Sequence, residues 1–346
     1  MITRSILGRQ GNLGRHEIGT RRYAALTVAA VAHMALAQFA LTHLAMAQTY
    51  PAKPVRVIVP LAAGGSTDNN GRLMAEKLGQ ALGQSFFVEN RVGASTDIGI
   101  GTLARSAPDG YTIGVVPLGS VATGILLRKL PYDPYKDITP IGGISKGALV
   151  IVVSGSSSYQ TLADLIATAK AKPGFISFGS IGIGSSHHLA GELLKQMTGT
   201  DMLHVPFKGA SESNLAVLAN QIESSISGSS SIASQVRAGK LRTLAVTNGE
   251  RVPPLPGVPS VAEYVPGYSA GAGTLSLFAP GGTPVPIIMR LNTEMRAALK
   301  QPEVIKRLAD AGEHPSPSTP EELAAELRVD IEKYTNLVRT SGVKLN

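Results

Sequence analysis

The stretch Val55-Arg-Val-Ile-Val59, followed directly by Pro60-Leu-Ala-Ala-Gly-Gly-Ser-Thr-Asp68, decides the fold. A short run of β-branched residues that ends at a proline and two glycines predicts a buried strand and then a loop. Ser66 or Thr67 supplies a hydroxyl for an N-cap, so a helix is predicted from there to about Leu82. A strand, a glycine-rich loop and a helix form the repeating unit of an α/β protein.

The same alternation continues along the chain. Strands are predicted at residues 85–89 and 111–116, with a helix between them that ends near Ala107. A second series predicts strands at residues 149–153, 176–178, 202–205, 223–226 and 241–246, and helices at 161–172, 186–197 and 210–219. This order indicates mostly parallel sheets with right-handed crossovers. We expect an α/β protein with two lobes, each a mostly parallel sheet flanked by helices.

The C-terminal part is predicted to be helical, at residues 286–299, 302–311 and 319–340. Thr319-Pro-Glu-Glu322 has the spacing of a capping box, as does Thr161-Leu-Ala-Asp164 earlier in the chain. No strand is predicted among the C-terminal helices, so we expect them to pack on the first lobe. The predicted lobes are residues 48–147 with 271–346, and residues 148–270, with hinges near 143–148 and 271–277.

A second glycine-rich loop, Gly179-Ser-Ile-Gly-Ile-Gly-Ser-Ser-His187, also lies between a predicted strand and a predicted helix. Glycine lets the backbone approach a ligand closely, and the free N–H groups of the first helical turn attract an anion. One such loop is weak evidence, since many strand-to-helix turns contain glycine. Two loops, one in each predicted lobe, predict a cleft that holds a small anion at both ends.

Residues 1–47 have the three parts of a secretory signal. Arginines make the first part positive, an alanine-rich apolar run begins at Ala24, and Ala45-Met-Ala47 is a cleavage site. We expect an exported protein that begins at Gln48, with Ala35-Leu-Ala37 as a competing site. Arg21-Arg22 leaves the choice between the general secretory route and the twin-arginine route open.

Removal of this leader changes the charge of the protein. The full chain has 32 basic and 24 acidic residues, and the leader holds five of the basic ones and one acidic one, which leaves 27 and 23 and a net charge of +4. This ordinary balance and the 5% aromatic content argue against nucleic-acid binding. The chain has no cysteine, so disulfides, thiolate nucleophiles and cysteine-ligated zinc are excluded.

Three enzyme-like patterns are interpreted as coincidental. Gly143-Ile-Ser145-Lys-Gly147 matches a nucleophile elbow, but no helix is predicted after it. Gly99-Ile-Gly101 matches part of a dinucleotide fingerprint, but it lies inside a predicted helix. His187 and His188 are adjacent in a predicted helix and point about 100° apart, so they are poorly placed to share a metal ion. We therefore predict no catalytic residue, no metal site and no cofactor.

The amino-acid sequence resembles that of a known family over residues 48–346. The matching motifs run in order and at the family spacing: Tyr50-Pro-Ala-Lys-Pro-Val-Arg-Val-Ile-Val-Pro60, Ala63-Gly-Gly-Ser-Thr-Asp68, Val88-Glu-Asn-Arg91, Ala107-Pro-Asp-Gly-Tyr-Thr112, Leu130-Pro-Tyr-Asp-Pro134, Ser185-Ser-His-His-Leu-Ala-Gly-Glu192, His204-Val-Pro-Phe-Lys-Gly-Ala210 and Ala279-Pro-Gly-Gly-Thr-Pro284. These motifs resemble the Bug family of periplasmic substrate-binding proteins of tripartite tricarboxylate transporters, also called TctC-like.

The resemblance implies a type II periplasmic binding-protein fold with a hinged cleft between two lobes. It implies that the protein is a monomer that captures a small carboxylate, a di- or tricarboxylate or an aromatic acid, for membrane permease subunits. A sensor module that presents its ligand to a receptor kinase is the alternative. The ligand-binding residues that it implies are Leu61, Gly64, Gly65, Ser66, Asp68, Ser120, Thr123, Ser185, Ser186, His187, Ser227 and Gly228. Whether Asp68 contacts the ligand through water or caps the first helix stays open.

One departure from the family pattern bears on the ligand. The family commonly has Phe-Asp in the last loop of the cleft, where this chain has Ile226-Ser227. Loss of that acid removes a partner for a ligand amino group. We therefore predict a plain carboxylate ligand rather than an amino acid.

Overall fold

The computed structural model describes residues 50–253 and 255–341. The chain divides into two compact units, Met1–Ala52 and Lys53–Asn346, and every helix and strand described below lies in the second. The predicted signal peptide and its cleavage site at Ala47 lie outside the described residues. Within the described part of the chain, no helix has the length and apolar character needed to cross a membrane.

The first predicted strand and helix are present in the fold. Strand β1 (Val55–Val59) lies between β2 (Phe86–Asn90) and β3 (Thr112–Pro117), and both pairings are parallel. Helix α2 (Ser66–Leu82) follows β1, and α3 (Asp97–Ala104) follows β2 after the 3-10 turn η1 (Ala94–Thr96). The apolar residues of β1 are buried, as the β-branched run predicts.

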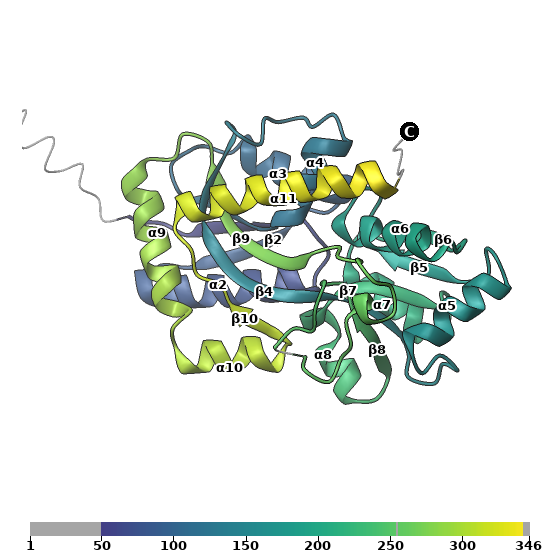
Figure 1. Ribbon diagram of the computed structural model, residues 1–346. Helices are drawn as coiled ribbons and strands as arrows, with labels where there is room; N and C mark the ends of the chain where they lie inside the picture. Colours follow the sequence, from purple (N-terminus) through teal and green to yellow (C-terminus); the bar gives the residue numbers. More distant parts are fainter. Residues whose placement is uncertain (1–49, 254, 342–346) are drawn as a thin grey trace, which may run out of the picture. The chain divides into compact units, whose positions relative to one another are not determined.

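Two long strands run through the centre of the sheet (Figure 1). Strand β4 (Ile138–Ser154) pairs with β9 (Ala272–Pro280) over its first eleven residues, up to Ala148, and with β7 and β8 from Leu149 onward. A short strand, β10 (Glu313–Pro315), adds to β4 between the C-terminal helices. All of these pairings are antiparallel.

The second series of strands and helices surrounds the far end of β4. Strand β5 pairs in parallel with both β6 and β7, and the helices α5 to α8 lie around these strands (Figure 1). The bounds are α5 (Leu162–Ala171), β5 (Ser177–Ser180), α6 (Ser186–Thr198), β6 (Leu203–Pro206), α7 (Ala210–Leu218), β7 (Ser224–Gly228), α8 (Ser229–Arg237) and β8 (Leu241–Val246), followed by η2 (Val261–Glu263).

The predicted α/β class is confirmed, and the sheet is more mixed than predicted. The order β2-β1-β3-β9-β4-β7-β5-β6 joins two parallel groups through the antiparallel strands β4 and β9. Pro140, Gly142 and Gly143 interrupt the apolar pattern of β4, where its register against β9 also shifts. For this reason the first half of β4 was not predicted as a strand, and neither was most of its partner β9.

The C-terminal helices lie against elements of both groups of strands. Helix α11 (Pro320–Ser341) packs against β4, α4 (Leu118–Leu127) and α6, and Figure 1 shows it crossing over α3 and α4. Helices α9 (Val285–Ala298) and α10 (Pro302–Asp310) precede it. Both predicted capping boxes are present, since Thr161 exchanges hydrogen bonds with Asp164 and Thr319 with Glu322.

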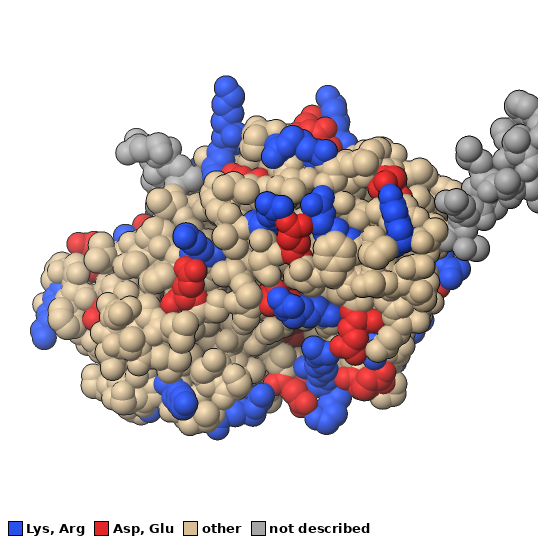
Figure 2. Space-filling view, turned by 180° about the vertical axis from the view of Figure 1, so that it is seen from behind, with Lys and Arg blue, Asp and Glu red and all other residues tan. Residues whose placement is uncertain are grey.

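Charges of both signs are mixed on the face seen in Figure 2, where basic and acidic side chains lie among one another over the tan surface. Ion pairs at the surface include Arg251 with Glu263 at 2.8 Å and Arg307 with Glu76 at 3.0 Å. This face shows no continuous basic stripe of the kind that follows a phosphate backbone.

Candidate functional site

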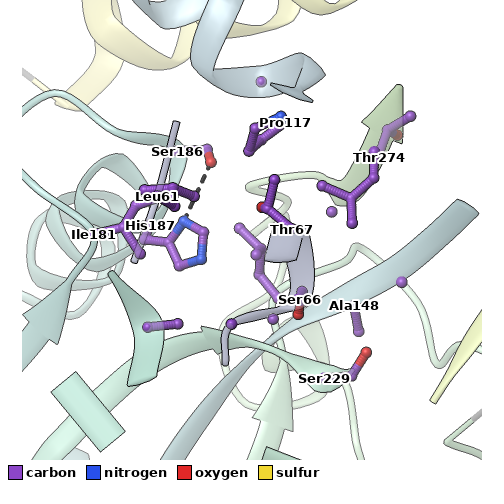
Figure 3. Close-up of a pocket in the computed structure, with 18 of the residues that line it drawn as sticks. Leu61, Ser66, Thr67, Pro117, Ala148, Ile181, Ser186, His187, Ser229 and Thr274 are labelled. Atoms are coloured by element: carbon purple, nitrogen blue, oxygen red, sulfur yellow. Dashed lines mark hydrogen bonds between the residues drawn. The ribbon is translucent and has the colours of Figure 1, made fainter. Parts of the chain in front are cut away.

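A small cavity of about 50 Å³, measured as the space open to the centres of water molecules, lies between the two groups of strands (Figure 3). Its wall comes from many loops that are far apart in the sequence. The lining residues are Leu61, Ala62, Gly65, Ser66, Thr67, Pro117, Gly119, Gly147, Ala148, Leu149, Ile181, Ser186, His187, Ala210, Gly228, Ser229, Gly273, Thr274, Leu275 and Glu313.

Five helices begin at this cavity. The wall includes the first or second residue of α2 (Ser66), α4 (Gly119), α6 (Ser186), α7 (Ala210) and α8 (Ser229). The first N–H groups of a helix have no acceptor within the helix. Each helix N-terminus stabilises a nearby anionic group by about 0.3–1 kcal/mol, and by up to about 2 kcal/mol when the group is partly buried. The cavity is therefore built to attract negative charge.

The donors around the cavity are neutral. Within residues 50–253 and 255–341, no lysine or arginine contributes to the wall. Ser66 Oγ is buried and has no hydrogen-bond partner among the described residues, whereas Ser229 Oγ donates to the carbonyl of Gly312 at 2.9 Å. A buried hydroxyl without a partner is rare because its desolvation is unfavourable. Ser66 is thus available to a bound molecule.

The structure brings six of the twelve predicted ligand residues together in the cavity wall. They are Leu61, Gly65, Ser66, Ser186, His187 and Gly228. Figure 3 shows Leu61 and His187 close together on one side, with Ser66 and Thr67 facing them from α2. Their role in binding stays a prediction.

The other six predicted residues lie outside the wall, namely Gly64, Asp68, Ser120, Thr123, Ser185 and Ser227. Ser185 is the N-cap of α6, and its hydroxyl accepts a hydrogen bond from the N–H of His188 at 3.2 Å. Ser227 Oγ donates to Asn214 Oδ1 at 2.6 Å, and Thr123 Oγ1 donates to the carbonyl of Ser120 at 3.3 Å. Gly64 adopts a positive φ of 83° in the loop before α2.

Asp68 is buried behind this loop, and its carboxylate is fully occupied. It accepts hydrogen bonds from the Gly64 N–H at 2.9 Å, from Asn90 Nδ2 at 3.0 Å and from two nitrogens of Arg72. Burial raises the pKa of Asp68, but the hydrogen bonds from Arg72, Gly64 and Asn90 outweigh burial and lower it overall. Asp68 holds the loop before Gly65, which is the N-cap residue of α2, so it does not cap that helix. A water-mediated contact of Asp68 with the ligand stays a prediction.

We expect an Asp68→Asn variant to lose about 1–3 kcal/mol of unfolding free energy at neutral pH, because buried donors lose a charged acceptor. A carboxyl with a lowered pKa contributes stability above its unfolded-state pKa and loses it as the pH falls through the folded-state pKa. The difference in unfolding free energy between wild type and variant should therefore become smaller at acid pH. Urea unfolding at neutral and acid pH measures it, with the exposed Asp201→Asn as control. A gap that does not change with pH would contradict this assignment.

The adjacent histidines have different surroundings. His187 lines the cavity, and burial lowers its pKa to about 4, so that it is neutral near pH 7. His188 Nδ1 accepts the N–H of Gly184 at 3.0 Å, and its ring stacks on His204 at 3.9 Å. Of the two histidines, only His187 lines the cavity.

Ser145 lies inside β4 rather than at a turn between a strand and a helix. Its hydroxyl is buried between Asn70 Oδ1 at 3.1 Å and Glu313 Oε2 at 2.9 Å. The G-x-S-x-G pattern is therefore part of a strand. The glycine Gly147 lets the Glu313 side chain lie against β4, since a Cβ at this position would come within 2.9 Å of Glu313 Cγ.

Sequence reasoning missed several residues of the wall. Ala210 follows a glycine at a predicted helix start, so the rule that found Ser66 and Ser186 also applies to it. Ser229 begins a helix that was not predicted, and Glu313 belongs to a three-residue strand without any periodic pattern. No local signal marks Glu313, because a single glutamate between two helices is usually exposed.

The two sides of the cavity are in close contact. A Cβ at Gly228 would lie 2.3 Å from Ser66 Oγ, and one at Gly119 would lie 3.3 Å from the Ser186 Cβ. Ser95 Oγ donates to the carbonyl of Ile183 at 2.7 Å. These contacts join loops from the first group of strands to loops from the second, so the cavity is narrow and enclosed.

Comparisons with known proteins agree with this geometry. The family model "Tripartite tricarboxylate transporter family receptor" matches residues 71–342. The chain is 33% identical over 301 residues to Protein BugT of Bordetella pertussis, which covers 86% of this chain and 92% of BugT.

Solved structures are similar over nearly their full length. The periplasmic binding protein BugD is 32% identical, with a TM-score of 0.81 and coverage of 85% of this chain and 99% of BugD. R. palustris Rpa4515 with adipate is 33% identical, with a TM-score of 0.82 and coverage of 85% and 99%. MatC from Rhodopseudomonas palustris with bound malate is 30% identical, with a TM-score of 0.78 and coverage of 84% and 100%. The chain therefore belongs to the tripartite tricarboxylate transporter receptor family, whose fold is that of a periplasmic solute-binding protein and not of an enzyme.

Proposed function

We propose that this protein captures a small carboxylate in the periplasm and delivers it to the membrane permease subunits of a tripartite tricarboxylate transporter. The observation that carries the proposal is the meeting of five helix N-termini at one cavity whose described wall has no lysine or arginine. Such a wall binds a carboxylate through N–H and hydroxyl donors and contains no basic side chain to form an ion pair with it. A dicarboxylate is favoured, because helices begin on both sides of the cavity.

Two relatives support this class of ligand. The solved structures of Rpa4515 and MatC are described with adipate and with bound malate, and both molecules are dicarboxylic acids. The chain is 33% and 30% identical to these proteins, respectively. The similarity supports the chemical class and leaves the chain length of the ligand to experiment.

Capture would work by closure of two lobes, residues 48–147 with 271–346 and residues 148–270. The change of partners along β4 supports this division, since β9 pairs up to Ala148 and β7 and β8 pair from Leu149. A strand that belongs to both lobes can bend at this point, and glycines such as Gly147 and Gly271 lie beside it. The contacts across the cavity would be those of the closed form.

Export to the periplasm would use the leader at residues 1–47, with cleavage after Ala47. The positive n-region and the alanine-rich run support this proposal. N-terminal sequencing of the protein recovered from a periplasmic extract would test it, with Gln48 as the expected first residue.

A thermal-shift and calorimetric panel tests the ligand class. Adipate, malate, citrate and benzoate represent carboxylates, while adipamide and 2-aminoadipate represent a neutral and an amino-acid analogue. We expect at least one carboxylate to raise the melting temperature, because a ligand at 100 times its Kd stabilises the fold by about 2.7 kcal/mol. Adipamide should not bind, and 2-aminoadipate should bind more weakly than adipate.

Two results would count against the proposal. One is a panel in which no carboxylate stabilises the protein. The other is binding of 2-aminoadipate about ten-fold or more tightly than adipate, a difference of about 1.4 kcal/mol, which would indicate an amino-acid carrier.

A further inference from the structure

A buried carboxyl group lies in the wall of this anion-attracting cavity. Glu313, from the short strand β10, is 3% exposed and lines the cavity together with the first residues of the five helices. An ionised carboxylate here would repel the ligand proposed above and would weaken the effect of the helix N-termini. The presence of Glu313 therefore needs a chemical explanation.

In the part of the chain that the structure describes, Glu313 has no cationic partner. The charged groups on the elements packed around it form ion pairs elsewhere: Lys146 with Glu326, Asp68 with Arg72, Lys77 with Glu303, Glu76 with Arg307, and Lys306 with Asp310. Arg237 donates to the carbonyl of Asp310, and His314 is exposed. The histidine of the cavity wall, His187, is neutral above its pKa of about 4.

The contacts of Glu313 are with neutral groups from α2 and β4. Asn70 Nδ2 donates to Glu313 Oε2 at 2.9 Å and to the carbonyl of Ser66 at 3.0 Å, which uses both of its hydrogens. Ser145 Oγ lies 2.9 Å from the same Oε2 and 3.1 Å from Asn70 Oδ1. All three side chains are almost completely buried.

The count of hydrogens is complete when the carboxyl of Glu313 carries a proton. Ser145 has one hydroxyl hydrogen for two contacts, so with an ionised Glu313 either the 2.9 Å contact to Glu313 Oε2 or the 3.1 Å contact to Asn70 Oδ1 lacks a hydrogen. If Glu313 Oε2 carries a proton, it donates to Ser145, Ser145 donates to Asn70 Oδ1, and Asn70 donates back to Oε2. Burial raises the pKa of Glu313 and outweighs the hydrogen bonds from Ser230, Asn70 and Ser145, which lower it, so the pKa is raised overall and the neutral state is favoured.

We propose that Glu313 is a specificity-determining residue of the cavity, held as the neutral acid by Asn70 and Ser145, so that the site accepts a carboxylate and disfavours a cationic amine. This inference rests on the proposed function and adds to it a chemical reason for the choice of ligand. It also makes binding depend on pH. Ionisation of Glu313 places a negative charge beside the ligand, so affinity falls as the pH rises above the pKa of Glu313.

Calorimetry with adipate on the full-length protein, from about pH 6.5 to about pH 9, tests the coupling, because adipate is fully ionised over most of this range. Wild-type affinity should fall towards ten-fold per pH unit above the pKa of Glu313, as expected when one proton is linked to binding. The affinity of Glu313→Gln should change by less than about two-fold over the same range. Glu321→Gln removes an exposed acid and should follow the wild-type slope.

Infrared difference spectra between wild type and Glu313→Gln test the protonation without any ligand. A protonated-carboxyl band present in wild type at pH 7 and absent in the variant is expected. If Glu313→Gln does not fold, Glu313→Met, which fills a similar volume without a charge, takes its place in both measurements.

The outcomes separate this inference from the function itself. Absence of the infrared band at pH 7, or a wild-type affinity for adipate that stays constant across a pH range in which the band disappears, would overturn the neutral-acid assignment. Tight binding of 2-aminoadipate that is lost in Glu313→Gln would overturn it as well, since Glu313 would then pair with an amine. Failure of every carboxylate to bind would refute the proposed function, while the infrared band would still decide the state of Glu313.

Discussion

A Gly119→Val variant is expected to bind adipate about 100-fold more weakly than wild type, a loss of about 2.7 kcal/mol. A Cβ at Gly119 would lie 2.7 Å from Tyr334 Oη and 3.3 Å from the Ser186 Cβ. Tyr334 is 1% exposed and belongs to α11, so its ring has no space into which it can move. The added side chain must then displace the start of α6, which forms part of the cavity wall. Isothermal titration calorimetry measures the effect.

The cause of this loss can be isolated with a second substitution. A Gly119→Ala variant adds only the Cβ, whose closest contact is the hydroxyl of Tyr334. Removal of that hydroxyl in the double variant Gly119→Ala with Tyr334→Phe should therefore restore part of the adipate affinity that Gly119→Ala loses. Gly257→Ala is the control, because a Cβ there meets no atom within 4 Å. An affinity of Gly119→Val within about three-fold of wild type, under 1 kcal/mol, would show that the close packing of Gly119 against Tyr334 and Ser186 is not required for binding.

An Arg128→Met variant is expected to lose about 3–5 kcal/mol of unfolding free energy, the largest effect on stability that we expect. Arg128 donates two hydrogen bonds to Asp97, from Nε at 2.7 Å and from Nη2 at 3.0 Å, and a third to the carbonyl of Gly184 at 3.1 Å. The Asp97 side chain is only 9% exposed. Removal of the arginine leaves this carboxylate buried and unpaired, which is more unfavourable than the loss of the contact alone.

The double variant Asp97→Asn with Arg128→Met tests this explanation. It removes both charges, so it should be more stable than Arg128→Met alone in urea unfolding at neutral pH. A single variant within about 1 kcal/mol of wild type would mean that water reaches Asp97 and replaces the arginine. Because Gly184 precedes α6, the single variant should also weaken adipate binding.

Local signals predicted the starts of the helices well. Helix α6 begins at Ser186 and the Thr161 capping box is present, both as predicted. The predicted hydroxyl N-cap of the first helix at Ser66 or Thr67 is wrong, because α2 begins at Ser66 after Gly65, an N-cap residue without a side chain. Helix starts can be predicted because the N-cap group and the N–H that it satisfies lie within four residues of each other.

The strands that join the two groups were harder to predict. Most of β9 and the first half of β4 were not anticipated, because glycines and a proline interrupt their pattern. Their stability comes from pairing with each other across more than 100 residues of sequence. Helices α4 and α8 were missed as well, since each begins immediately after a strand with no intervening loop. A strand or helix of this kind is specified by its neighbours in space.

The sequence by itself determined that glycine-rich loops precede helices at Ser66 and Ser186, and hence that the protein offers N–H groups to an anion. The tertiary structure decided that α4, α7 and α8 begin at the same cavity. It also placed Glu313 beside Asn70, 243 residues earlier in the chain, and beside Ser145. The physical reason is range: a helix start depends on adjacent residues, whereas the state of a buried carboxyl depends on every group that folding brings around it.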